Sequence, residues 1–319
     1  MSNTRREFLQ TSAALAVGLM GGAATELRAE AAATAQAAAT PGPEMAPHVQ
    51  VPKMKFGGVE IGRLVLGANQ FHGYAHYNAN FGKTMTDWYT PDKICEVLHR
   101  ANSYGINAFN YFSGPGAPEY LARFQAEGGK MHLIPQVTAR DDAATMVKNL
   151  KPLGLQRQGE VVDVEFRNGT MDTVKEWCKR VRDMGVLVGV GTHKPEVIAY
   201  VEEKGWDVDF YSGCVYNRTR TEAEWKELFH GEMLEMPHDI YLRSDPERMY
   251  KVMRQTTKPC FAFKILAAGR IDDEDVEKAF RTAFASIKPI DGVYVGMFPK
   301  RKDEVKENAE IVHRILTTA

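Results

Sequence analysis

Strand-like and helix-like patterns alternate eight times between residues 64 and 316, and this alternation limits the folds open to the chain. Short apolar runs bounded by glycine, proline and polar residues predict strands, whereas apolar residues every three or four positions predict helices. Parallel strands need a long crossover, usually a helix, between them. Eight consecutive strand-helix units favour a closed (β/α)8 TIM barrel over an open, doubly wound sheet.

Each predicted element is defined by residue range. The predicted strands cover residues 64–69, 107–112, 132–138, 161–167, 186–192, 208–216, 259–265 and 292–297. The predicted helices begin at Pro91, after the capping residue Thr90, and then cover residues 118–126, 143–150, 172–184, 195–204, 274–287 and 302–316. A hairpin at residues 56–63 precedes the first strand, and a charged helical insertion at residues 221–255, broken near Pro237, follows the sixth.

The N-terminus has the features of an export signal. Arg5 and Arg6 precede Phe8-Leu9 and a glycine-softened apolar run, and Ala29-Glu30-Ala31 offers a small-x-small cleavage site. The apolar run is too short to form a stable membrane span. We therefore predict a twin-arginine signal peptide at residues 1–31, a disordered linker at 32–52 and the barrel at 53–319. The translocase of the twin-arginine route would deliver the protein to the periplasm.

Composition excludes some classes of function. The net charge of −1 gives no basic surplus for nucleic-acid binding. The four cysteines form no C-x-x-C pair, so neither a zinc ribbon nor an iron-sulfur site is expected. His72, His76, His193 and Glu165 lack the spacing of a metal site, so no metal is indicated. We expect a small-molecule substrate at the carboxyl ends of the strands.

Several polar residues fall where predicted strands end. Asn110 and Tyr111 close the second strand, before the Gly114-Pro115-Gly116 loop, and should point to opposite sides. His193 follows the fifth strand, where it could act as an acid, a base or a ligand, or simply cap the next helix. Lys264 ends the seventh strand, where an apolar surrounding would suit proton transfer or Schiff-base chemistry. Alternatively, Lys264 reaches the solvent or pairs with Glu165.

The predicted strand at residues 161–167 carries three charged side chains at alternate positions. Period-two alternation places Asp163, Glu165 and Arg167 together on the inner side of the barrel. Buried charges must be paired or hydrogen-bonded. This set is therefore either an internal salt-bridge network or part of the functional site.

Taken together, these segments resemble the aldo/keto reductase family over most of the chain after residue 53. The likeness rests on residues 57–67, 105–110, 189–196 and 295–308, and on Asp163 at the position of the Asp in that family's fourth strand. The resemblance implies NADP as cofactor. It would place Phe263 against the nicotinamide, Lys300 or Lys302 at the 2'-phosphate and Asn308 at the adenine.

The family's catalytic tetrad of Asp, Tyr, Lys and His is replaced in this chain. Asn110 stands at the Asp position, the loop after Ser113 replaces the Tyr region, Gln136 or Thr138 replaces the Lys, and Asn168 replaces the His. A carbonyl oxygen thus lacks its usual proton donor in hydride transfer.

Three hypotheses follow. The first is an NADP-dependent carbonyl or alcohol oxidoreductase with a rebuilt centre, using Tyr111 assisted by Asn110, His72 or His193. The second is a non-redox lyase, isomerase or hydrolase that acts on a sugar-like substrate through Glu165, His193 and Lys264. The third is a barrel that binds a ligand without catalysis.

Overall fold

The computed structural model describes residues 49–138, 141–232 and 239–318. The predicted signal peptide and most of the predicted linker lie outside these residues. Within the described residues, nine strands form one parallel sheet and two form an antiparallel hairpin. None of the helices described is both long and apolar enough to cross a lipid bilayer.

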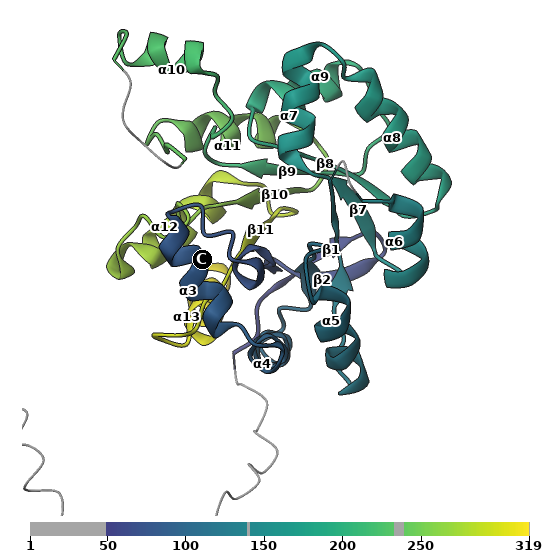
Figure 1. Ribbon diagram of the computed structural model, residues 1–319, viewed down its shortest axis with the longest axis vertical. Helices are drawn as coiled ribbons and strands as arrows, with labels where there is room; N and C mark the ends of the chain where they lie inside the picture. The colour runs from purple at the N-terminus through teal and green to yellow at the C-terminus, as the bar shows by residue number, and fades with distance from the viewer. Residues whose placement is uncertain (1–48, 139–140, 233–238, 319) are drawn as a thin grey trace, which may run out of the picture. The chain divides into compact units, whose positions relative to one another are not determined.

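The parallel sheet closes into a barrel surrounded by helices (Figure 1). Its strands are β3 (Leu64–Gly67), β4 (Ala108–Asn110), β5 (His132–Leu133), β6 (Gln136–Val137), β7 (Gly154–Arg157), β8 (Leu187–Thr192), β9 (Phe210–Cys214), β10 (Cys260–Phe263) and β11 (Gly292–Val295). The order across the sheet is β5-β4-β3-β11-β10-β9-β8-β7-β6. The predicted TIM barrel with an N-terminal hairpin is confirmed.

The third barrel strand consists of β5 and β6, which lie at the two ends of that order. Pro135 separates them, because proline has no N–H to donate to a neighbouring strand. Hydrogen bonds nevertheless continue on both sides: Ile134 N–H donates to the Phe109 carbonyl at 2.9 Å, and Gln156 N–H donates to the Pro135 carbonyl at 2.9 Å. These bonds close the barrel.

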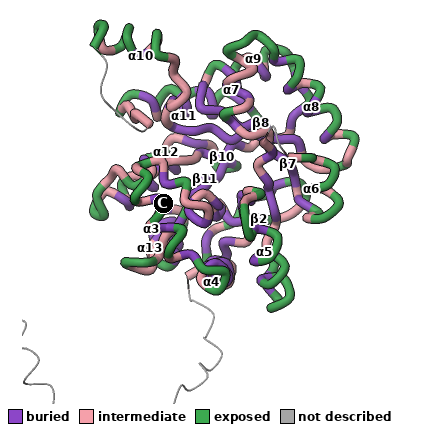
Figure 2. The backbone as a smooth tube through the Cα atoms, viewed as in Figure 1, coloured by how far each residue is buried: buried purple, intermediate pink, exposed green. Residues whose placement is uncertain are grey.

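The helices lie outside the sheet and expose their outer faces, while the strands are buried (Figure 2). They are α3 (Ala79–Trp88), α4 (Pro91–Ser103), α5 (Ala117–Ala126), α6 (Ala143–Leu150), α7 (Gly159–Asn168), α8 (Asp172–Asp183), α9 (Pro195–Glu203), α10 (Glu222–Leu228), α11 (Asp245–Gln255), α12 (Val276–Ser286) and α13 (Glu304–Thr317), with short 3-10 turns at Asn69–His72 and Asp273–Asp275. The Thr90 side chain accepts from Lys93 N–H, as the predicted cap requires. The second half of the predicted insertion is α11, which packs on α9, α12 and β9 as the sixth barrel helix.

The predicted strand at residues 161–167 is wrong. These residues belong to α7, and the fourth barrel strand is β7, which ends one residue before Gln158. β7 lacks the apolar run that predicts a strand, since Gly154, Gln156 and Arg157 surround Leu155. The buried residues of α7 are Gly159, Val162 and Asp163, which are spaced as one face of a helix. Glu165 and Arg167 therefore do not point into the barrel as alternating strand residues.

The hairpin of β1 (Lys53–Phe56) and β2 (Val59–Gly62) contributes to the core inside the barrel. The Phe56 ring, only 3% exposed, contacts Phe210 of β9 and Phe261 of β10 edge to face, each with centroids 5.1 Å apart. Such aromatic pairs add to the free energy gained by burying the rings. Phe56 thus packs the hairpin against two strands that lie more than 150 residues later in the chain.

Replacing Phe56 by alanine should lower the free energy of unfolding by about 3–5 kcal/mol, since it empties a buried aromatic site. The neighbouring Lys55 is exposed, and Lys55→Ala should change that free energy by less than about 0.5 kcal/mol. Urea unfolding of both variants measures the difference. Equal stability of the two variants would contradict this role of the hairpin.

Candidate functional site

A cavity of about 930 Å³ opens at the carboxyl ends of the barrel strands. Its lining includes the carboxamides of Asn110, Gln136, Gln156 and Gln158; the basic and imidazole side chains of His76, His193, Arg218 and Lys264; a groove with Phe263, Lys300, Lys302 and Asn308; and the carboxylates of Glu160, Asp272, Asp273, Glu304 and Glu307. Ligand pockets of proteins typically hold about 300–1,000 Å³. The cavity is large enough for a ligand the size of a dinucleotide or for two smaller ligands.

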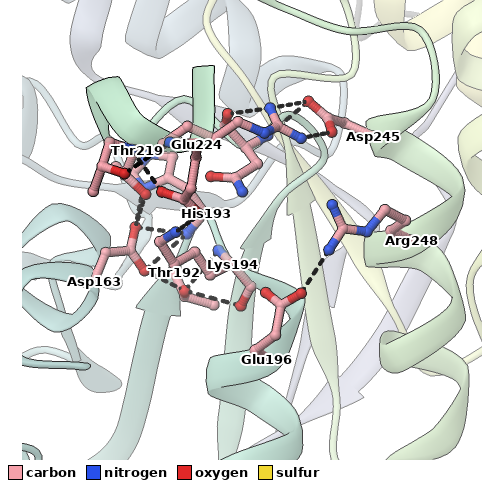
Figure 3. Close-up of polar contacts among 12 residues, drawn as sticks. Asp163, Thr192, His193, Lys194, Glu196, Thr219, Glu224, Asp245 and Arg248 are labelled. Carbon is pink, nitrogen blue, oxygen red and sulfur yellow. Dashed lines mark hydrogen bonds and ion pairs between the residues drawn. The ribbon is translucent and has the colours of Figure 1, made fainter. Parts of the chain in front are cut away.

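His193 and Asp163 form a buried pair at the edge of the cavity (Figure 3). Asp163 comes from α7 and is 1% exposed, and its Oδ2 accepts from His193 Nδ1 at 2.7 Å. The same carboxylate also accepts from the backbone N–H of His193 at 3.0 Å, from Thr219 Oγ1 at 3.1 Å and from the hydroxyl of Thr192. Four donors, from the end of β8, from His193 directly after it and from the segment after β9, thus balance one buried charge.

This pairing determines which nitrogen of His193 is available for chemistry. A carboxylate only accepts, so Nδ1 carries the proton and Nε2 carries the lone pair. His193 lines the cavity, and its Nε2 has no hydrogen-bond partner among the described residues. Burial lowers the pKa of His193, although Asp163 opposes this shift. The neutral ring therefore offers a base to a molecule bound in the cavity.

Lys264 follows β10 directly and also lines the cavity. Its backbone φ of 63° lies in the left-handed region, which non-glycine residues rarely adopt and which is often found at functional sites. Its Nζ lies 5.6 Å from the centroid of the Phe263 ring and forms no ion pair with a described residue. Burial lowers the pKa of Lys264 to about 8, so most of the amines are charged at pH 7. The predicted pairing with Glu165 is not present.

A second carboxylate, the half-buried Asp239, joins three loops beside Lys264. Its Oδ2 accepts from His76 Nδ1 at 3.0 Å and from Arg218 Nε at 2.7 Å. Arg270 donates to the carbonyls of both His76 and Asp239, at 2.6 and 3.0 Å. The Asn69 amide lies 3.3 Å from His76 Nε2, a contact that suits a neutral imidazole. Burial and the nearby Lys264 charge lower the pKa of His76 to about 4.

Carboxamides occupy the inner end of the cavity. Gln136 Nε2 donates to Asn110 Oδ1 at 2.7 Å, and Asn110 Nδ2 donates to the Ile134 carbonyl at 2.9 Å. Gln156 Oε1 accepts from the Ser212 hydroxyl at 2.5 Å. These bonds leave an acceptor on Gln136 and a donor on Gln156 for a ligand. An uncharged surface with both donors and acceptors suits hydroxyl groups.

The four residues expected to hold the cofactor all lie along the cavity. Asn308 is 2% exposed, and its side chain makes no hydrogen bond to a described residue. Lys302 pairs with Glu307 at 2.6 Å and with Asp273 at 3.1 Å, whereas Lys300 forms no ion pair among the described residues. The groove beside Phe263, Lys300 and Asn308 is open. The Asn308 amide, which lines the cavity, and the unpaired Lys300 fit the adenosine end of a dinucleotide.

Three of the six predicted catalytic residues do not line the cavity. Tyr111 is 1% exposed and lies on the side of β4 opposite Asn110, where burial raises the pKa of its hydroxyl to about 12. His72 packs against Gly114 and the Phe112 ring. Glu165 accepts from the hydroxyl of Thr170 on the exposed side of α7. Asn110, His193 and Lys264 are brought together.

Sequence reasoning missed Arg218, Thr219 and Asp239 as members of the site. All three come from the segment between β9 and α11, which has no periodic pattern that would place a side chain in a barrel mouth. The charged triplet Arg218-Thr219-Arg220 directly after a strand was the available signal. No group of three His, Cys, Asp or Glu side chains within the described ranges has the arrangement of a metal site.

No protein-family model and no curated protein matches the chain. Among solved structures, an assigned aldo-keto reductase from Pseudomonas aeruginosa is similar with a TM-score of 0.52 and 13% identity, covering 87% of this chain and 99% of the other. A truncated 3-deoxy-D-arabino-heptulosonate 7-phosphate synthase from Thermotoga maritima is similar with a TM-score of 0.51 and 13% identity, covering 85% and 92%. At such low sequence identity, the structural similarity shows a shared TIM-barrel fold and nothing more specific. The resemblance to aldo/keto reductases holds at that level.

The His76 pair should make folding sensitive to acid. Because the pKa of His76 is about 4 in the folded protein and about 6.5 when unfolded, only the unfolded chain binds this proton between those pH values. The stability contribution is complete above pH 6.5 and is lost as the pH falls to 4, by up to about 3 kcal/mol. His76→Asn should flatten the dependence of unfolding free energy on pH in this window, measured by urea titration.

Replacement of His99 controls for the loss of any histidine, since its side chain is 37% exposed. His99→Asn should keep the slope of the parent protein. The same slope in His76→Asn and the parent would contradict the assignment.

Proposed function

We propose that the protein is a nicotinamide-dependent oxidoreductase that oxidises a hydroxyl group on a polyhydroxylated substrate. The observation that carries this proposal is the continuity of the cavity, which extends from His193 past Phe263 to Lys300 and Asn308. One ligand can therefore lie along the groove while a second lies against His193. The similar aldo-keto reductase fold is compatible with this arrangement.

The residues of this chain have separate roles in the proposed reaction. Phe263, whose ring contacts that of His193 with centroids 5.6 Å apart, would lie against the nicotinamide, and Asn308 and Lys300 would hold the adenosine end. Nicotinamide, when bound, supplies a hydride acceptor. His193 Nε2 takes the hydroxyl proton, and Asp163 stabilises the imidazolium that forms. The carboxamides of Asn110, Gln136 and Gln156 bind the remaining hydroxyls of the substrate.

This assignment replaces the residues of the family's tetrad with a different base. A neutral His193 at neutral pH favours proton removal, and hence oxidation of an alcohol, over protonation of a carbonyl. Tyr111 and His72, the donors expected from sequence, are turned away from the cavity. We also propose export by the twin-arginine route, which carries folded proteins and would let the cofactor bind before translocation. Outside the cytoplasm, where free NADPH is scarce, the enzyme would have to retain it.

A non-redox reaction on a sugar-like substrate is the second candidate. It is favoured by one observation, the unpaired Lys264 with a pKa near 8, which can supply an uncharged amine. Turnover of a sugar by protein that does not bind NADPH or NADH would select this alternative.

NADPH should bind the full chain, quench its tryptophan fluorescence and raise its melting temperature. At 100 times the Kd, binding stabilises a folded protein by about 2.7 kcal/mol. Lys300→Gln should weaken NADPH binding about tenfold and NADH binding much less, since one unpaired charge faces the 2'-phosphate in this proposal. Fluorescence titration measures both affinities.

The matched control for Lys300 is Lys148→Gln, on the exposed surface of α6 and away from the cavity. It removes the same charge and should leave both affinities unchanged. Absence of any fluorescence or melting response to saturating NADPH and NADH would overturn the proposed function.

Replacing the proposed base should reduce turnover without loss of the cofactor. His193→Gln should lower kcat about 10²–10⁴-fold in a screen of sugar alcohols and sugars with NADP, because no other group in contact takes the proton. The Kd for NADPH, measured by fluorescence, should stay within about threefold of the parent value, which is a change in binding free energy of less than about 1 kcal/mol. Parent-like kcat in this variant would show that His193 is not the base.

A further inference from the structure

The amino end of α7 forms part of the cavity wall. The helix follows β7 after the single residue Gln158, and Gly159 and Glu160 line the cavity. No side chain caps this end of α7. The first N–H groups of a helix have no partner within the helix, and they carry a partial positive charge. A helix end alone is a common feature, so its neighbours decide whether it has a ligand.

Two glycines bring this helix end against the strand that carries His193. A Cβ on Gly159 would lie 3.0 Å from the Thr192 nitrogen, and a Cβ on Gly191 would lie 3.1 Å from the Gly159 nitrogen. Larger residues at either position would push α7 away from β8. The contact holds the free amides of α7 next to His193.

His193 supplies the second, independent observation. The residue is 5% exposed, yet its Nε2 faces the cavity without a partner among the described residues. Lys264 faces the same space, and its ammonium has no ion partner among those residues. A hydrogen-bonding nitrogen, an unpaired cation and a helix amino end therefore converge on one part of the cavity.

The other charged groups near Lys264 are two cations, Arg218 and Arg270, and two carboxylates, Asp239 and Glu160. Arg218 pairs with Asp239 at 2.7 Å and more loosely with Glu160 at 3.4 Å, and His76 also bonds to Asp239. The Cys214 thiol is fully buried beside them, and burial raises its pKa to about 11, so it is uncharged. The positive charge of Lys264 is the one that a ligand would neutralise.

We propose that Lys264 and the amino end of α7, next to His193, bind an anionic oxygen group of the substrate, a carboxylate or a phosphate. The inference rests on the proposed function and names its substrate class, an acidic polyol such as a sugar acid or a sugar phosphate. The anionic group lies between Lys264 and the α7 amides, a hydroxyl of the same molecule faces His193 Nε2, and the other hydroxyls meet the carboxamides. Charge and hydroxyl recognition are thus divided between two ends of one subsite.

The test compares the affinities of matched ligands for the full chain by isothermal titration calorimetry, without added cofactor and at constant ionic strength. Gluconate, glucose 6-phosphate and glucose share a polyol and differ in charge, and inorganic phosphate probes the anion site alone. At pH 7, at least one acidic ligand should bind ten or more times more tightly than glucose. Gluconate and glucose 6-phosphate distinguish the carboxylate from the phosphate.

Lys264→Met should reduce this preference at least fivefold, Lys264→Arg should retain it, and Lys148→Met should leave it unchanged. The preference should also decline between pH 7 and pH 9.5, as Lys264 loses its proton with a pKa of about 8. The proposal is overturned if glucose binds as tightly as both acidic ligands, if none of the four probes binds, or if folded Lys264→Met keeps the full preference. Because no cofactor is added, these outcomes are separate from the NADPH titration that tests the proposed function.

Discussion

The buried carboxylate of Asp163 is the constraint on which the arrangement of the site depends. A charge that is 1% exposed has to be compensated by donors, or it would be too costly to bury. Its donors are the backbone and ring of His193, with the hydroxyls of Thr192 and Thr219, so α7, β8 and the chain after β9 must meet there. The same bonds fix the tautomer of His193 and the direction of its free nitrogen. The position of His193 and the protonation of its ring thus have one cause.

Periodicity was sufficient to predict most of the barrel because strands and helices in α/β folds differ in period and length. The helix at residues 143–150 and the cap at Thr90 agree with the structure. The sequence does not indicate the fourth strand, because valine-rich α7 resembles a strand locally, while β7 carries Gln156 on its barrel side and Arg157 on its helix side. The Ser212 hydroxyl of β9 donates to the Gln156 side chain and so compensates for its burial. A contact between residues this far apart in the chain cannot be recognised from the local sequence.

The site was predictable only where a residue directly ends a barrel strand. Asn110, His193 and Lys264, which the sequence places at strand ends, all line the cavity, since strand ends meet at one rim. The alternation of side chains also predicts that Tyr111 points away from Asn110, and Tyr111 is indeed buried outside the cavity. Asp239 could not be found, because its partners His76 and Arg218 lie in loops that only the closed barrel brings together. A resemblance of fold, likewise, locates a groove without stating which group moves a proton.

Asp239 also has a consequence for how this barrel can change over generations. TIM barrels usually diversify one loop at a time, because each loop projects from its own strand. Here the loops after β3, β9 and β10 meet at one residue through His76, Arg218 and Arg270. A substitution at any one of these positions leaves a charge or a polar group of another loop without its partner. The three loops are therefore expected to change together or not at all. Changes in ligand preference would arise more readily at the carboxamides Asn110, Gln136 and Gln156 than in these loops.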